Sequence, residues 1–292
     1  MNGKKRKDAL LLSLIWLCAF ITVLILLGII GYILYKGLPN LSLRFLTTEY
    51  SASKNGSQGI LPMIINTVYV VVLTLLLAVP ICIGGAIYMT QYARQGRVIR
   101  VIRFATEVLS GIPSVIFGLF GYAIFVVLFQ LKLSILSGSL TMMICILPII
   151  VRTTEESLLA VPDAYREGGL ALGAGKLRVT IGIVLPCALP GIRTGVVIAI
   201  GRIVGETAAL LFTVGVSGYY MPKGDNIFTA LFGHIFDQGN TLALHLYNSA
   251  MNGKDPPAVP FATAGTLLVL VFLINRVAVW ASRDLKRARV NK

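Results

Sequence analysis

Residues Leu10–Tyr35 read LLLSLIWLCAFITVLILLGIIGYILY, an apolar run without a single charged side chain. About 20 consecutive apolar residues are enough for a helix to cross the hydrocarbon core of a bilayer. Four basic residues precede the run, which is longer than the core of a signal peptide and has no evident small-x-small cleavage site. We therefore expect residues 10–35 to stay in the protein as a first transmembrane helix.

Five further apolar segments follow along the chain: Ile64–Tyr92, Phe104–Leu131, Ser139–Leu159, Pro190–Val214 and Phe261–Ala281. Three of these segments have a proline in their interior, namely Pro80, Pro113 and Pro148. A membrane helix tolerates a proline where neighbouring helices satisfy the backbone groups that the proline leaves without a hydrogen bond. The sequence thus predicts an all-α integral membrane protein with six transmembrane helices.

The composition excludes several classes of protein. The chain is 56% hydrophobic and 13% charged, whereas soluble domains carry about 25% charged residues. Its net charge of +14 could suggest a nucleic-acid binder, but the basic residues sit in short clusters between apolar runs. The four cysteines form no CxxC pair and His234 and His245 stand alone, so we expect small buried thiols, ordinary loop histidines and no metal site.

The basic residues also predict which loops face the cytoplasm. With the N-terminus inside, the inward segments hold Lys4, Lys5, Arg6, Lys7, Arg94, Arg97, Arg100, Arg103, Arg166, Lys176, Arg178, Arg283, Lys286, Arg287, Arg289 and Lys292. The outward segments hold only Lys36, Arg44, Lys54, Lys132, Lys223 and Lys254. This bias supports an even number of spans, with both termini of the chain in the cytoplasm.

The predicted inward loop Val161–Ile192 reads VPDAYREGGLALGAGKLRVTIGIVLPCALPGI. Pro162 and Asp163 are a helix-start signal, and Gly173 suits the left-handed position that ends a helix. A second amphipathic segment, Lys176–Val184, would end at Leu185-Pro186. We expect two short helices joined at a glycine hinge.

This loop resembles the E-A-A-x3-G-x9-I-x-L-P motif of permeases in ATP-binding-cassette (ABC) importers. The matching residues are Glu167, Gly168, Gly169, Gly173, Ile183, Leu185 and Pro186. The resemblance implies that the first short helix docks on a separate ATP-hydrolysing subunit and transmits its motion to the spans. Two glycines replace the usual alanines, each at a cost of about 1 kcal/mol in helix propensity.

No phosphate-binding loop is encoded in this chain. Gly175-Lys176 resembles the tail of one, but Leu177 follows where Ser or Thr is required, and Leu170 stands where the first glycine should be. We therefore expect that the chain is not an enzyme and binds no cofactor, and that ATP is hydrolysed by another chain. The resemblance implies two copies of this ATPase.

Charged residues inside apolar segments are candidates for function because they are costly in a bilayer. Arg202 lies 12 residues beyond Pro190, about 18 Å along a helix and thus near mid-membrane. Glu206 would share its helix face, either in a structural ion pair or holding the guanidinium toward an oxyanion. Arg152 ends the apolar part of its span, and Glu107 follows Arg103 by one turn, which favours a helix-end pair.

Three segments extend the resemblance, namely Ser110–Gly121, Arg152–Glu156 and Gly201–Thr213. They are similar to the A-type permease of the phosphate-specific (Pst) ABC importer. This resemblance implies a cytoplasmic tail at 1–9, a first helix at 10–35, an outward loop at 36–63, and a tail at 285–292. Between them, 64–284 would form the type I transmembrane domain, with its coupling loop at 160–189 and an outward loop at 215–260.

The resemblance implies an importer of inorganic phosphate in the cell membrane, with Arg202, Glu206 and Arg152 along the substrate path. Its partners would be a homologous second permease, the ATPase and an extracytoplasmic phosphate-binding protein. Another oxyanion, such as sulfate or molybdate, is the nearest alternative. An autonomous channel or ion-coupled transporter would need no docking loop, and a membrane enzyme would need a catalytic set that is not evident. Within the outward loop, Ile227–Phe236 is either a short interfacial helix or irregular.

Overall fold

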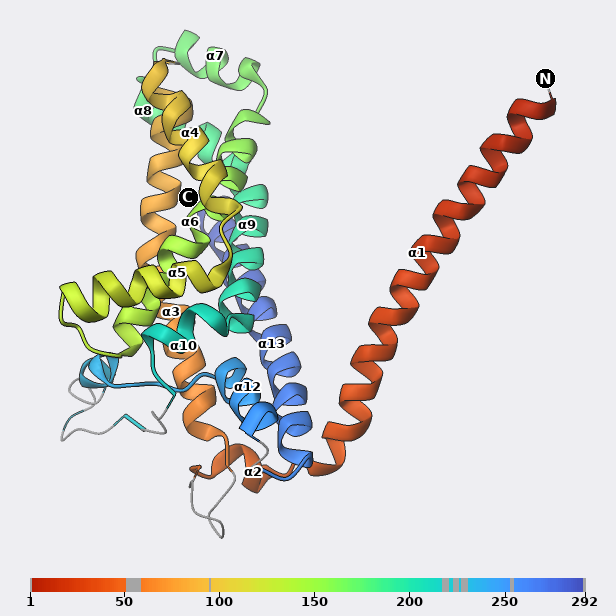
Figure 1. Cartoon of the computed structure of the whole chain (residues 1–292). Helices are drawn as coiled ribbons and strands as arrows, with labels where there is room; N and C mark the ends of the chain where they lie inside the picture. The colour runs from red at the N-terminus through yellow and green to blue at the C-terminus, as the bar shows by residue number, and fades with distance from the viewer. Residues whose placement is uncertain are drawn as a thin grey trace.

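The chain folds into a bundle of long helices with shorter helices at both ends. The computed structural model describes residues 2–50, 59–94, 96–216, 221–222, 226, 231–252 and 255–290. The long helices are α1 (Asn2–Gly37), α3 (Leu61–Ile87), α6 (Ile135–Leu159), α9 (Leu185–Gly205) and α13 (Ala258–Val290). In Figure 1, α7 (Asp163–Ala171) and α8 (Lys176–Val179) lie at one end of the bundle, here the α7 end. Helices α2 (Leu43–Thr47) and α12 (Leu242–Asn252) lie at the opposite end, here the α2 end.

The described helices confirm the predicted class of fold. Five of them are long and apolar enough to cross a membrane, and a bent pair of shorter helices makes a sixth. Helices satisfy all backbone hydrogen bonds within one segment, which lipid requires. The described part of the chain is thus all-α, with the spans of an integral membrane protein.

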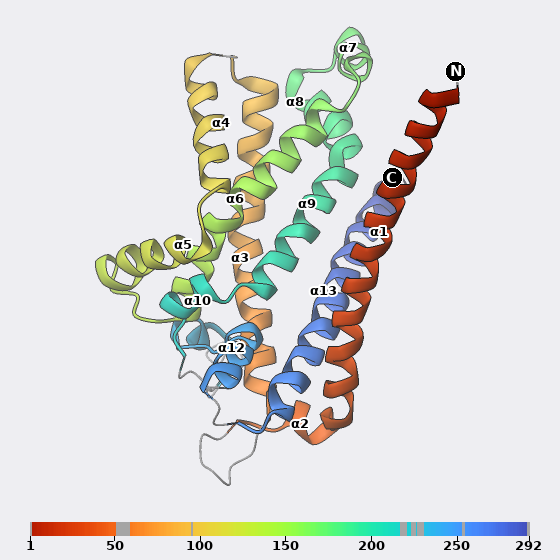
Figure 2. The same cartoon turned by 45° about the vertical axis from the view of Figure 1, so that its right-hand side comes forward.

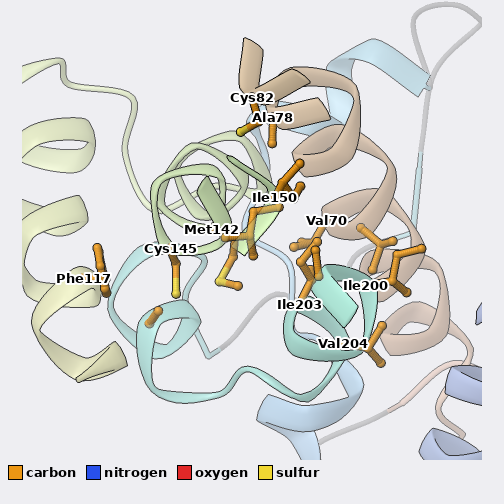
Figure 3. Packing of buried hydrophobic residues seen from close by; sticks show 14 of the residues in the cluster. Val70, Ala78, Cys82, Phe117, Met142, Cys145, Ile150, Ile200, Ile203 and Val204 are labelled. Carbon is orange, nitrogen blue, oxygen red and sulfur yellow. The ribbon is translucent and has the colours of Figure 1, made fainter. Parts of the chain in front are cut away.

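Helix α6 is the centre of the bundle. It packs against α3 on one side and α9 on the other, and Figure 3 shows the buried side chains that meet there. Met142 and Ile150 of α6, Val70 of α3 and Ile203 of α9 are all at most 1% exposed. This apolar core fixes the positions of α3, α6 and α9, which carry most of the candidate site.

The third predicted span, Phe104–Leu131, is wrong as a single straight helix. The structure has α4 (Arg97–Ser110) and α5 (Ser114–Gly121), which continues as a π-helical turn to Leu128, and the two parts meet at 105°. Pro113 at the break lacks an N–H donor and disfavours helical geometry at Ile112. Helix α5 instead lies across the bundle, where Gly118 packs on Ala209 of α10 (Ala208–Thr213).

The fifth predicted span, Pro190–Val214, is also not one helix. The structure gives a continuous helical path from Lys176 through a π-helical turn at Thr180–Val184 to Gly205. The prediction that Leu185-Pro186 ends a short helix is therefore wrong. Pro186 lies in the first turn of α9, where a proline loses no helical hydrogen bond. Helix α9 ends at Gly205, and α10 follows after Glu206 and Thr207.

Helix α1 contacts the rest of the chain mainly through α13. The Tyr32 and Phe261 rings meet edge to face at 5.7 Å, and Gly37 lies against the Phe261 carbonyl. Figure 1 shows α1 meeting α13 near the α2 end and running away from the bundle towards its N-terminus. Towards its N-terminus its apolar side chains, such as Trp16 (70% exposed), contact no other helix of this chain extensively.

A buried polar cluster closes the α2 end, and it corrects the prediction that both histidines are ordinary loop residues. His234 Nε2 lies 2.8 Å from Asn66 Oδ1, and Asn66 Nδ2 donates to the Asn240 carbonyl at 3.3 Å. His245 is 1% exposed and stacks edge to face on Tyr50. Burial lowers the pKa of His245 to about 4 and also lowers the pKa of His234, which Asp237 opposes. Both imidazoles are thus held neutral, and residues 231–236 are helical, while 227–230 lie outside the described residues.

Candidate functional site

The loop at the α7 end has the predicted hinge. Helix α7 ends at Ala171, and Gly173 adopts φ +82°, the left-handed conformation expected for the residue after a helix. The start of α7 differs from the prediction, because Pro162 occupies the cap position and Asp163 makes no capping hydrogen bond. Asp163 instead accepts an ion pair from Arg166 at 2.5 Å.

Helix α7 is fixed rigidly to both neighbouring spans. Arg166 Nη2 donates to the Leu158 carbonyl at the end of α6, at 2.7 Å. A Cβ on Gly169 would lie 2.9 Å from both Ile183 and Val179, so α7 rests closely on the helical path that leads into α9. Any displacement of α7 is therefore passed to α6 and α9.

The outer face of α7 is free for a partner. Glu167 is exposed, as are Tyr165 (55%) and Leu172 (90%). A Cβ on Gly168 would meet no atom within 4 Å. The two glycines of the motif thus differ, because Gly169 faces the bundle and Gly168 faces outward. Exposed apolar side chains such as Tyr165 and Leu172 are suited to docking.

The prediction that Arg202 and Glu206 share a helix face is wrong, because α9 ends at Gly205, between them. Glu206 is extended (φ −76°, ψ 124°), and its Oε1 accepts a hydrogen bond from Ala209 N at 3.3 Å, at the start of α10. Among the described residues no ion pair joins Glu206 to Arg202. Arg202 lies instead beside Cys145 of α6. Its Nε is buried and has no hydrogen-bond partner in the described part of the chain.

The position of Arg202 agrees with a deep site. Figures 1 and 2 show α9 ending between the two ends of the bundle, where α10 turns away. A Cβ on Gly201 or Gly205 would meet no atom of this chain within 4 Å. The backbone around Arg202 is therefore accessible from outside the chain, and these glycines do not pack on another helix of it.

The close contact between α9 and α6 instead involves Gly191 and Gly195, nearer the start of α9. Added Cβ atoms there would collide with Ser157 and Thr153 of α6. This is the small-xxx-small contact of membrane helices. A groove of about 470 Å³ runs along it, lined by Thr153, Glu156, Ser157, Ala160, Cys187, Ala188, Gly191, Thr194 and Gly195.

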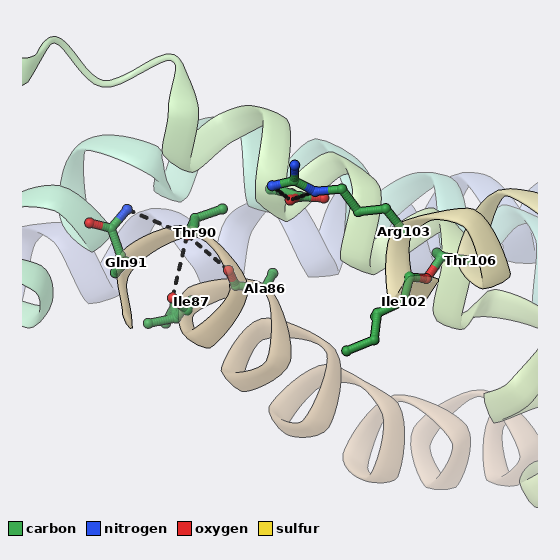
Figure 4. A network of polar contacts seen from close by, with 8 residues as sticks. Ala86, Ile87, Thr90, Gln91, Ile102, Arg103 and Thr106 are labelled. Atoms are coloured by element: carbon green, nitrogen blue, oxygen red, sulfur yellow. Dashed lines mark hydrogen bonds and ion pairs between the residues drawn. The ribbon is translucent and has the colours of Figure 1, made fainter. Parts of the chain in front are cut away.

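A second cavity, of about 280 Å³, lies where α4 meets α6 and the end of α3. Arg152 reaches it and pairs with Glu156 at 2.9 Å. Arg103 pairs with Glu155 at 2.5 Å, across two helices. Figure 4 shows Arg103 on α4 and, separately, Thr90, which donates to the Ala86 carbonyl where α3 passes into a π-helical turn. The structure places Arg152 in this cavity, whereas neither Arg202 nor Glu206 lines it.

Several polar residues in or beside the spans were missed from the sequence. Arg193 of α9 carries a buried Nε without a hydrogen-bond partner among the described residues. No role was predicted for Glu155. Its partner Arg103 lies four residues before Glu107 and was expected to pair with Glu107 within one helix. The sequence signal that could have identified Arg193 is its position as a charged residue between the two glycines of GIRTG, residues 191–195.

Comparison with known proteins identifies the family. Residues 81–287 match the family described as the binding-protein-dependent transport system inner membrane component. The chain is 36% identical over 282 residues to the probable ABC transporter permease protein YqgI of Bacillus subtilis, covering 95% of this chain and 96% of that one. It is 38% identical over 211 residues to the phosphate transport system permease protein PstA of Pasteurella multocida, covering 72% and 74%.

Two solved transporters share the fold. The permease of the MetNI methionine ABC transporter superposes with a TM-score of 0.53 at 19% identity, over 79% of this chain and 94% of that one. A bacterial ABC transporter that imports alginate gives 0.55 at 17% identity, over 91% and 96%. The chain thus belongs to the family of binding-protein-dependent transport system inner membrane components, the membrane-spanning permeases of ABC importers.

Proposed function

We propose that this chain is the permease subunit of an importer that carries inorganic phosphate across the cell membrane. The proposal rests on Arg202, a half-buried residue near the end of α9, whose buried Nε has no hydrogen-bond partner among the described residues. A phosphate that loses water inside a membrane needs a charged donor, and the planar guanidinium offers two parallel hydrogen bonds. The similarity to phosphate transport permeases over 72% of the chain adds support.

The mechanism follows from the attachment of α7. A separate ATPase, two copies per transporter, docks on the face that carries Glu167 and Leu172, and ATP is bound there and not in this chain. Closure of the ATPase displaces α7. Arg166 and Gly169 pass this motion to α6 and α9, and the spans tilt as rigid bodies. A homologous second permease completes the pathway, and a binding protein delivers phosphate at the α2 end.

Phosphate transport is tested by competition. Liposomes that contain the complete transporter should take up labelled phosphate only with internal ATP and external binding protein. Excess unlabelled phosphate should suppress this uptake, while sulfate and molybdate should not. Uptake that sulfate or molybdate suppresses more strongly would favour those oxyanions, for which a positively lined path is also suitable.

The orientation of the chain is tested by labelling. We propose that the α7 end faces the cytoplasm, because Arg94 between α3 and α4, and Arg97 and Arg100 at the start of α4, lie at that end. In a variant without its four cysteines, Leu43→Cys (79% exposed in α2) should react in intact cells with an impermeant thiol reagent. Arg94→Cys should react only after permeabilisation. The reverse pattern would place α7 outside, where no ATPase could dock.

A further inference from the structure

Glu155 and Glu156 are neighbours on α6 but have different partners. Glu155 is 13% exposed and binds Arg103 of α4, so this pair joins two helices. Glu156 binds Arg152 one turn earlier on its own helix, and these side chains are 63% and 69% exposed. Glu156 also lines both the α4–α6 cavity and the α6–α9 groove. Glu156 is therefore shared by the two hollows, whereas Arg152 lines the α4–α6 cavity.

An ion pair as exposed as Arg152–Glu156 is easily broken by a competing anion. Pairs at i and i+4 on a solvated helix face are among the weakest ion pairs in proteins. An oxyanion with two charges and several oxygens binds a guanidinium through two parallel hydrogen bonds. The side-chain hydrogen bond that the described structure gives Glu156 comes from Arg152 Nε, at 2.9 Å. A doubly charged oxyanion can therefore displace Glu156 from Arg152.

We propose that Glu156 is a positioning residue that occupies Arg152 while the cavity is empty and leaves it when the transported oxyanion arrives. This inference rests on the proposed function in that the ligand is an oxyanion. While paired, Glu156 keeps Arg152 directed into the cavity and neutralises it. A singly charged anion such as chloride or nitrate then competes poorly with the carboxylate. Glu156 thereby sets which anions can bind Arg152 and how tightly they are held.

The test is a double-mutant cycle on the complete purified transporter, with equilibrium binding of labelled phosphate and, separately, labelled sulfate. Glu156→Gln should raise the affinity for the oxyanion about tenfold, because a carboxylate on the same guanidinium as an anion opposes its binding. It should also allow nitrate to compete. In the Arg152→Gln background, the same change should leave the affinity unaltered. Because the oxyanion is released more slowly, Glu156→Gln should also lower turnover.

Glu155→Gln is the matched control, since it removes the same charge from the same cavity. Any gain in affinity that it causes should be equal with and without Arg152. A gain from Glu156→Gln that is also independent of Arg152 would mean a general effect of charge and would overturn the proposal. An unchanged affinity in Glu156→Gln, with normal co-purification of the ATPase, would overturn it as well. A gain seen with sulfate and absent with phosphate would support the role of Glu156 while rejecting phosphate as the substrate.

Discussion

Replacing Glu167 by lysine should lower ATP-driven uptake at least about tenfold, because like charges at an interface cost several kcal/mol and each 1.4 kcal/mol is a factor of ten. Glu167 is exposed on α7, and the change does not touch the packing of the bundle. The variant should therefore reach the membrane in normal amounts. Uptake into liposomes and co-purification of the ATPase measure the two effects separately.

Gly168→Ala is the matched control for this prediction. Its Cβ would meet no atom within 4 Å, and alanine favours the helix by about 1 kcal/mol over glycine. Uptake should stay within about twofold of the parent, since nothing on α7 has to move. Near-normal uptake by Glu167→Lys, at normal expression, would show that this face of α7 does not carry the coupling.

The elements predicted correctly are those whose signals are local. Long apolar runs predict membrane helices because lipid leaves the backbone few alternatives. Gly173 was assigned correctly, with φ +82°, because a helix that ends on a left-handed residue favours glycine whatever surrounds it. The composition and spacing of 161–173 likewise identified a short helix between two spans.

The errors lie where tertiary contacts decide the local structure. Pro113 could have been accommodated in a straight helix, and it breaks the span because Gly118 and Gly121 let α5 pack across α10 and α6. Both Gly191–Gly195 and Gly201–Gly205 have the spacing of a helix contact, and only the position of α6 decides that the first pair forms it. Pairing between helices, such as Arg103 with Glu155, leaves no periodic signal in a single sequence.

The break after Gly205 changes what the site at Arg202 can be. If α9 had continued, Glu206 would have neutralised Arg202 on the same helix face. In the structure, Glu206 binds the backbone of α10, and Arg202 Nε stays buried without a partner in the described residues. A guanidinium that is fixed but incompletely satisfied keeps its hydrogen-bonding capacity for a ligand.

Arg202→Gln should therefore lower phosphate uptake about 100-fold, a typical cost of removing one donor that is fixed in place for an anion. Glu206→Gln should lower it much less, because glutamine keeps a side-chain oxygen to accept from Ala209 N. Uptake per transporter is the measurement, with co-purification of the ATPase as the check on assembly. If the two residues formed a structural pair instead, both single variants would fail and the double variant would recover transport. Such recovery would remove Arg202 from the substrate path.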